Sequence, residues 1–133
     1  MSRENVEAAR RLYDARNRGD VEAVIAECHP RVEWRPHLSS LAGQAVQGHA
    51  GVRRYLASLA EDWEEFRHEP ERFFDAGDAV VAFLRTWARG RGSGVEVDLR
   101  VAHVITFAKT GSCIRSVSYL DRAEALEAVG LSE

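Results

Sequence analysis

One histidine interrupts an apolar stretch whose alternation is typical of a β-strand. His103 lies within Val95–Ala108, and side chains two residues apart on a strand point to the same face. If His103 faces inward, it shares an apolar wall with Val101, Ile105 and Phe107, where burial disfavours the charged imidazole. A neutral imidazole can take a proton from a carbon acid or hydroxyl group and return it elsewhere, as an aldol closure or double-bond shift requires. The alternative is a core histidine bonded to a neighbouring tyrosine or backbone group.

Other catalytic chemistries have no supporting motif. No His, Cys, Asp or Glu spacing resembles a metal site, and no glycine-rich phosphate loop follows a strand. A Ser-His-Asp arrangement has no sequence signature either. We therefore expect neither a metal nor a cofactor. The two cysteines, Cys28 and Cys113, are predicted to be buried thiols of a cytosolic protein rather than a disulfide.

The composition predicts one α+β domain over residues 1–133. The 133 residues are 45% hydrophobic and 29% charged, as in ordinary soluble globular proteins. A net charge of −3 argues against binding to nucleic acid or an anionic membrane. No apolar run approaches the roughly 18 residues of a membrane helix. The chain opens directly into a helical pattern without a signal peptide, so we expect a cytoplasmic protein.

The first half of the chain reads mostly as helix. Apolar residues recur at helical spacing over residues 2–18, 21–28 and 49–63. Gly19 and Asp20 separate the first two helices, and His29-Pro30 is expected to end the second. Residues 31–36 alternate as a short edge strand, and residues 38–48 read as a loop. His37 and His49 flank this loop, as inert surface residues or at the border of a pocket.

The second half reads mostly as strand. Period-two patterns separated by turns predict a four-stranded meander, followed by a short helix that Asp121 caps. The strands are expected at Phe66–Asp75, Ala79–Arg89, Val95–Ala108 and Ile114–Leu120.

Both central strands of this meander are apolar on both faces, so both faces must be covered. Three N-terminal helices can cover only one face. The simplest hypothesis is that the outer face packs on a second copy as a two-fold homodimer. The parity of Ala79–Arg89 stays open, so Arg85 and Trp87 face either the pocket mouth or the dimer partner.

The layout resembles the nuclear-transport-factor-2-like superfamily, within it the SnoaL-like group, which includes polyketide cyclases and has ketosteroid isomerases as cousins. The matching segments are Leu12–Asp20, Val32–Trp34, Gly48–Arg53 and the turn Ala76–Asp78. The resemblance implies a cone-shaped, curved antiparallel sheet packed against three N-terminal helices around a central pocket, a cystatin-like α+β barrel.

The isomerase signature residues transfer only in part. The position of the general base falls on Pro36, or on Arg35 after a shift of one residue, so the carboxylate is missing. The position of the oxyanion-binding tyrosine falls on Leu12. Tyr13 is one place off, which turns a helical side chain by about 100°, so it is a poor substitute. The resemblance places His103 where isomerases and SnoaL-like cyclases carry an aspartic acid.

The resemblance also implies a pocket lining that would hold a small hydrophobic ligand. Two serines pointing inward would leave space and supply hydroxyl groups, whereas the opposite parity would turn them to solvent or a partner. Two hypotheses follow: a cofactor-independent cyclase or isomerase that uses His103, or a non-catalytic ligand-binding or dimerisation module. The expected lining residues are Leu12, Tyr13, Trp34, Leu56, Leu59, Trp63, Phe66, Val101, Ile105, Ser116, Ser118 and Leu120.

Overall fold

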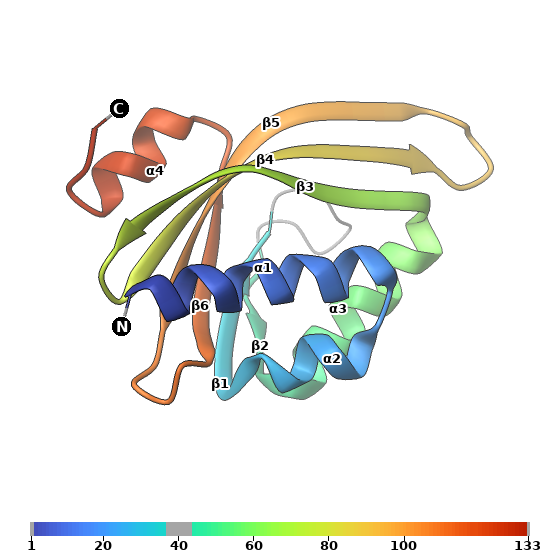
Figure 1. Ribbon diagram of the computed structural model, residues 1–133. Helices are drawn as coiled ribbons and strands as arrows, with labels where there is room; N and C mark the ends of the chain where they lie inside the picture. The colour runs from blue at the N-terminus through green and yellow to red at the C-terminus, as the bar shows by residue number, and fades with distance from the viewer. Residues whose placement is uncertain (1, 37–43, 133) are drawn as a thin grey trace.

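A computed structural model describes residues 2–36 and 44–132 (Figure 1). His37 and most of the predicted loop therefore lie outside the described residues. The elements in chain order are α1 (Ser2–Arg18), α2 (Val21–Ala26), β1 (Cys28–Arg35), β2 (Val46–Gln47), α3 (Gly48–Asp62), β3 (Trp63–Ala76), β4 (Ala79–Gly90), β5 (Glu96–Phe107), β6 (Cys113–Tyr119) and α4 (Arg122–Ala128).

The break between the first two helices follows from local chemistry. Gly19 adopts a φ of 72°, which an L side chain rarely tolerates, and so ends α1. The carboxylate of Asp20 then accepts a hydrogen bond from the Ala23 amide at 3.1 Å and caps α2. The chain therefore changes direction between Arg18 and Val21, where α1 ends and α2 begins.

Two predicted helix ends were wrong. The α2 helix stops at Ala26, because the chain from Cys28 onward pairs with β6 instead, and the Cys113 amide donates to the Glu27 carbonyl at 2.9 Å. Trp63, expected in the third helix, is extended and begins β3 opposite Gly90. In both cases backbone pairing across the sheet overrides the helical spacing of the side chains.

The six strands form one curved, unclosed sheet in the order β2-β1-β6-β5-β4-β3. The β3–β6 meander is antiparallel, as predicted. The β1–β6 pair is parallel, which corrects the expectation of a wholly antiparallel sheet. The short strand β2 pairs antiparallel with β1 and was not predicted. The last strand is thus bordered on both sides, which holds its inner face at the centre of the cone.

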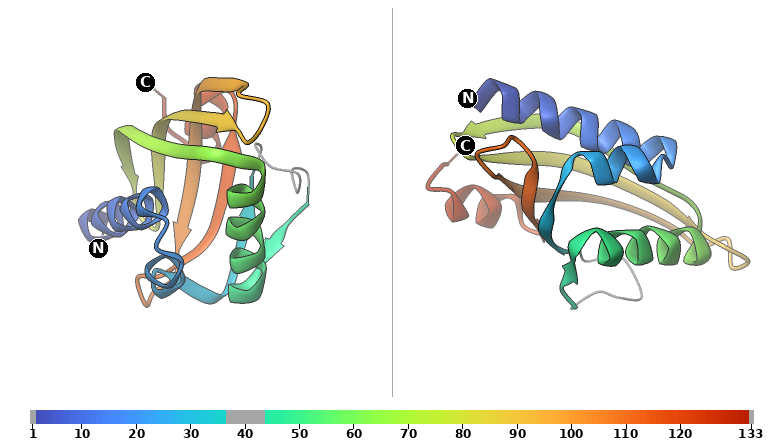
Figure 2. Two further views of the ribbon diagram at one scale, coloured as in Figure 1. Left: turned by 90° about the vertical axis from the view of Figure 1, so that its right-hand side faces the viewer. Right: turned by 90° about the horizontal axis from the view of Figure 1, so that it is seen from below.

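Helices α1, α2 and α3 lie on the concave side of the sheet and enclose a space with it (Figure 2). The main core, from Ala9 and Leu12 on α1 to Leu84 and Ile105 on the strands, fills much of this space. The opposite face is not left bare, since α4 lies against it (Figure 1). The outward side chains that α4 helps to bury are Ala79, Val81, Phe83, Ala102 and Val104.

The covering of the outer face bears on the predicted dimer. A second copy was predicted on this face because the three N-terminal helices can cover only the opposite one. Helix α4, capped by Asp121 through a 2.8 Å bond from the Ala123 amide, supplies part of that cover from within the chain.

Candidate functional site

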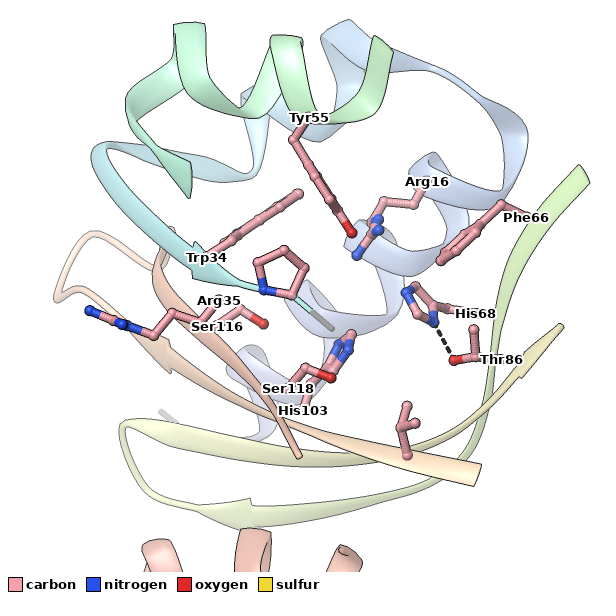
Figure 3. Close-up of a pocket in the computed structure, with 12 residues that line it drawn as sticks. Arg16, Trp34, Arg35, Tyr55, Phe66, His68, Thr86, His103, Ser116 and Ser118 are labelled. Carbon is pink, nitrogen blue, oxygen red and sulfur yellow. Dashed lines mark hydrogen bonds between the residues drawn. The ribbon is translucent and has the colours of Figure 1, made fainter. Parts of the chain in front are cut away.

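A small cavity lies between the concave face of the sheet and helices α1 and α3 (Figure 3). Its volume is about 30 Å³, room for only a water molecule or two. It combines aromatic rings with ionisable and hydroxyl groups. The lining residues are Arg16, Trp34, Arg35, Pro36, Tyr55, Phe66, His68, Thr86, Val101, His103, Ser116 and Ser118.

His103 faces inward from β5 and is 6% exposed. Its Nδ1 lies 2.7 Å from the hydroxyl oxygen of Tyr13, which projects from α1. Tyr13, which the sequence marked as a poor match for the isomerase tyrosine, therefore lies in direct contact with the imidazole. This hydrogen bond fixes the plane of the ring and assigns one of its two nitrogens to Tyr13.

A second buried histidine stands beside the first and was missed from the sequence. The ring centroids of His68 and His103 are 4.9 Å apart, edge to face. Nδ1 of His68 lies 2.7 Å from the hydroxyl of Thr86 on β4. Asn17 holds the His68 backbone in place, with its side chain bonded to both the carbonyl and the amide. The available signal was parity, since His68 and Phe66 share a face of one predicted strand.

Burial sets the protonation of these groups. It raises the pKa of the Tyr13 hydroxyl, which therefore stays a phenol. It also lowers the pKa of His68 well below 6.5, and the positive charge of Arg16 and the neighbouring His103 lower it further. Burial likewise raises the pKa of Tyr55, although Arg16 partly offsets that effect. The cavity is therefore lined by an uncharged His68 and the uncharged phenol of Tyr55 beside a guanidinium, and the Tyr13 phenol that contacts His103 is uncharged as well.

A larger hollow of about 350 Å³ opens between α1, α2, α3 and the start of β3. It shares Arg16, Phe66 and His68 with the small cavity, so these three side chains form a common wall. Leu56, Leu59 and Trp63, expected around the imidazole, line this larger hollow instead. Leu56 and Leu59 reach it from α3, and Trp63 from the first residue of β3.

The remaining predicted residues are divided between cavity, core and surface. Trp34, Val101, Ser116 and Ser118 line the small cavity. Leu12 and Ile105 are buried in the main core without lining either hollow. Leu120, expected to point inward, is 60% exposed, because β6 ends at Tyr119 and the chain turns there toward α4.

The structure also settles the parity of β4. Thr86 lines the cavity, so Arg85 and Trp87 point to the outer face. The guanidinium of Arg85 lies 2.7 Å from the Asp98 carboxylate there. His49, at the start of α3, places Nε2 2.9 Å from the Cys28 carbonyl and lines neither hollow.

Over residues 2–36 and 44–132, no group of three or more His, Cys, Asp and Glu side chains is arranged to hold a metal ion. None of the described helices is both long and apolar enough to cross a membrane.

Fold and sequence together place the chain in a family. Residues 9–116 match the model of the SnoaL-like domain, so the protein belongs to the SnoaL-like family. No curated protein matches it.

Solved structures share the fold over nearly the whole chain. TerC, crystallised with polyporic acid, is 28% identical with a TM-score of 0.77, covering 95% of this chain and 98% of TerC. An NTF2-like protein of unknown function from Burkholderia pseudomallei is 25% identical with a TM-score of 0.79. The match covers 98% of this chain and 99% of the Burkholderia protein. SalBIII, an epoxide hydrolase/cyclase-like enzyme of pyran ring formation in salinomycin, is 19% identical with a TM-score of 0.75. The match covers 88% of this chain and 90% of SalBIII, and at this identity it supports only a shared fold.

Proposed function

We propose that the protein binds an apolar, carbonyl-bearing small molecule and catalyses its cyclisation or isomerisation without a cofactor. The observation that carries this proposal is the buried 2.7 Å contact between the Tyr13 hydroxyl and Nδ1 of His103 in a cavity wall. An imidazole that a buried phenol holds in one orientation can serve as a general base and exchange a proton with a substrate.

The reaction that suits this arrangement moves a proton within one substrate molecule. The imidazole of His103 takes the proton from a carbon next to a carbonyl group, which leaves an enolate and an imidazolium. The imidazolium then returns the proton, either to another carbon in an isomerisation or to the alkoxide oxygen of a newly closed ring. No atom is gained or lost, so no co-reactant is required.

The family supports a small-molecule pocket of this kind. TerC, the solved structure at 28% identity, binds polyporic acid in its crystals. The cavity beside His103 is too small for a ring system, whereas the adjoining hollow of about 350 Å³ is of the size that small ligands occupy. We therefore place the body of the substrate in the larger hollow, with its carbonyl group directed past the shared wall toward His103.

The test is a His103→Ala variant beside a His29→Gln control, since His29 lines neither hollow. The assay follows conversion of cyclohex-3-enone to its conjugated isomer by ultraviolet absorbance. We expect the alanine variant to lose roughly 10²–10⁴-fold in turnover while ligand affinity is kept. Control and wild type should remain equally active after dialysis against a chelator. Equal binding without turnover in any form would instead support the non-catalytic binding module.

We also propose that the protein is a cytoplasmic homodimer. Helix α4 covers one part of the outer sheet face, and half-buried Trp87 and Val117 lie on the part that we assign to a partner copy. Sedimentation velocity at micromolar concentration should show a dimer that Val117→Arg dissociates, whereas a purely monomeric wild type would contradict the proposed dimer.

The proposed cytoplasmic location is tested by cell fractionation. The two free thiols, Cys28 and Cys113, favour a reducing compartment.

A further inference from the structure

Arg16 stands at the junction of the two hollows. It projects from the last turn of α1 into the small cavity (Figure 3). It also lines the larger hollow. Its guanidinium carbon lies 5.0 Å from the centroid of the Trp34 ring and 5.8 Å from that of Tyr55. Its positive charge lowers the pKa of His68, which lies in the same shared wall.

The charge of Arg16 is not neutralised in the way that neighbouring arginines are. Arg35, also on the cavity wall, lies 2.7 Å from the Glu33 carboxylate. Arg18, on the rim of the larger hollow, pairs with Asp14 at 3.4 Å and Asp20 at 3.6 Å. Over residues 2–36 and 44–132, no carboxylate lies within 4.0 Å of the Arg16 guanidinium, and the carbonyl end of α1 offers only a partial negative charge.

Among the described residues, none that lines the small cavity is acidic. The cavity presents the Arg16 guanidinium, which bonds the Tyr55 hydroxyl but has no carboxylate partner among the described residues. The hydroxyl groups of Ser116 and Ser118 beside it can donate hydrogen bonds. Arg16 is half-buried, and a positive charge that is partly removed from water is unfavourable unless a counter-charge meets it. A ligand that carries a negative charge would supply the group that the protein itself lacks at this point.

We propose that Arg16 is the anion-binding residue of the pocket, and that the natural ligand is an apolar molecule bearing a carboxylate or an ionised enol. The apolar body lies in the larger hollow against Leu56, Leu59 and Trp63, and the anionic group meets the guanidinium at the shared wall. This inference rests on the proposed function only for the existence of a small-molecule ligand and not for any reaction.

The competing explanation is that Arg16 serves packing alone, by stacking on Trp34 and Tyr55. Both explanations predict that removing the side chain lowers stability. They differ in whether the site discriminates a charged ligand from a neutral ligand of the same shape. A matched pair of probes therefore separates them.

The probes are 8-anilinonaphthalene-1-sulfonate and its neutral parent N-phenyl-1-naphthylamine, titrated by fluorescence against the full chain. The variants are Arg16→Met, which keeps the length of the stem, and Arg16→Lys, which keeps the charge. Arg10→Met is the matched control on the same helix, because Arg10 pairs with Glu7 and lines neither hollow. A Leu56→Gln variant in the lining of the larger hollow should weaken both probes and so locate them there. Unfolding curves confirm that each variant is folded before it is titrated.

We expect the wild type to bind one equivalent of the anionic probe at least tenfold more tightly than the neutral probe. Arg16→Met should abolish that preference without weakening the neutral probe, Arg16→Lys should retain part of it, and Arg10→Met should leave it unchanged. Equal affinity for both probes in the wild type, loss of both in Arg16→Met, or no binding of either probe would overturn the proposal. A preference for the anionic probe without any turnover would support the anion-binding role of Arg16 and contradict the proposed catalytic function.

Discussion

The hydroxyl of Tyr13 lies 2.7 Å from Nδ1 of His103, although the two residues are 90 positions apart in the chain. The contact ties the middle of α1 to the middle of β5 across the interior. Since Tyr13 is 1% exposed and His103 6%, each group depends on the other for a hydrogen-bond partner that bulk water cannot supply.

Tyr13→Phe should destabilise the protein by about 1–3 kcal/mol, because it leaves a buried imidazole nitrogen without its partner. Urea denaturation measures the free energy of unfolding. Tyr119→Phe is the control, since no hydrogen bond to the Tyr119 hydroxyl occurs among the described residues, and it should change stability by less than about 0.5 kcal/mol. Equal effects of the two substitutions would show that the contact with His103 contributes nothing.

The architecture followed from side-chain periodicity where that periodicity was strong. The meander and the capping of α4 by Asp121 were predicted close to where they lie. The parallel pairing of β1 with β6 was not, because side chains 31–36 carry no information about which distant strand receives their backbone hydrogen bonds. Pro30 is locally a helix breaker, yet it lies within β1, because pairing with β6 makes that strand begin at Cys28.

The site shows a similar division. The inward face of His103 follows from alternation with Val101 and Ile105. Its partners do not, because Tyr13 and His68 reach it from α1 and β3 through packing between elements rather than along one. A helix rotated by a fraction of a turn would have separated Tyr13 from His103, and no local pattern reports that rotation.

The stability of the protein should fall as the pH drops below about 6.5. The pKa of His68 is lowered in the folded state by burial, Arg16 and His103, whereas an unfolded histidine titrates near 6.5. The unfolded chain therefore binds a proton that the folded chain refuses. Each pH unit below 6.5 removes about 1.4 kcal/mol until the folded pKa is reached. Urea denaturation at pH 7.5 and 5.5 measures the change.

The comparison that isolates His68 uses His68→Gln and His29→Gln. The first variant should lose stability at every pH but show a flatter dependence between pH 7.5 and 5.5, since the group that titrates is gone. The second should keep the wild-type slope, because half-buried His29 lies outside both hollows. An unchanged slope in His68→Gln would assign the pH dependence to other groups.

Helix α4 should contribute to stability well beyond its seven residues, because it covers apolar side chains of the outer face. Leu126 is 2% exposed, so Leu126→Ala should cost about 2–5 kcal/mol. Asp121→Ala removes the helix cap and should cost about 1 kcal/mol. Thermal unfolding compares both with exposed Glu127→Ala, and a Leu126→Ala protein as stable as this control would show that α4 does not seal the sheet.

The two cysteines should be unreactive in the folded protein despite their proximity. Cys28 and Cys113 are register partners in the parallel pair β1–β6, and they are only 5% and 0% exposed. The hydrogen bond with the Cys113 thiol, and then burial, raise the pKa of Cys28, whereas the same contact lowers the pKa of Cys113. The lack of exposure of both sulfur atoms is therefore what should keep a disulfide reagent away. We expect 5,5′-dithiobis(2-nitrobenzoate) to titrate two thiols in guanidinium chloride, and none in native protein within minutes. Rapid reaction of the native protein would show that β1 separates readily from β6, whereas fewer than two thiols after denaturation would reveal a disulfide.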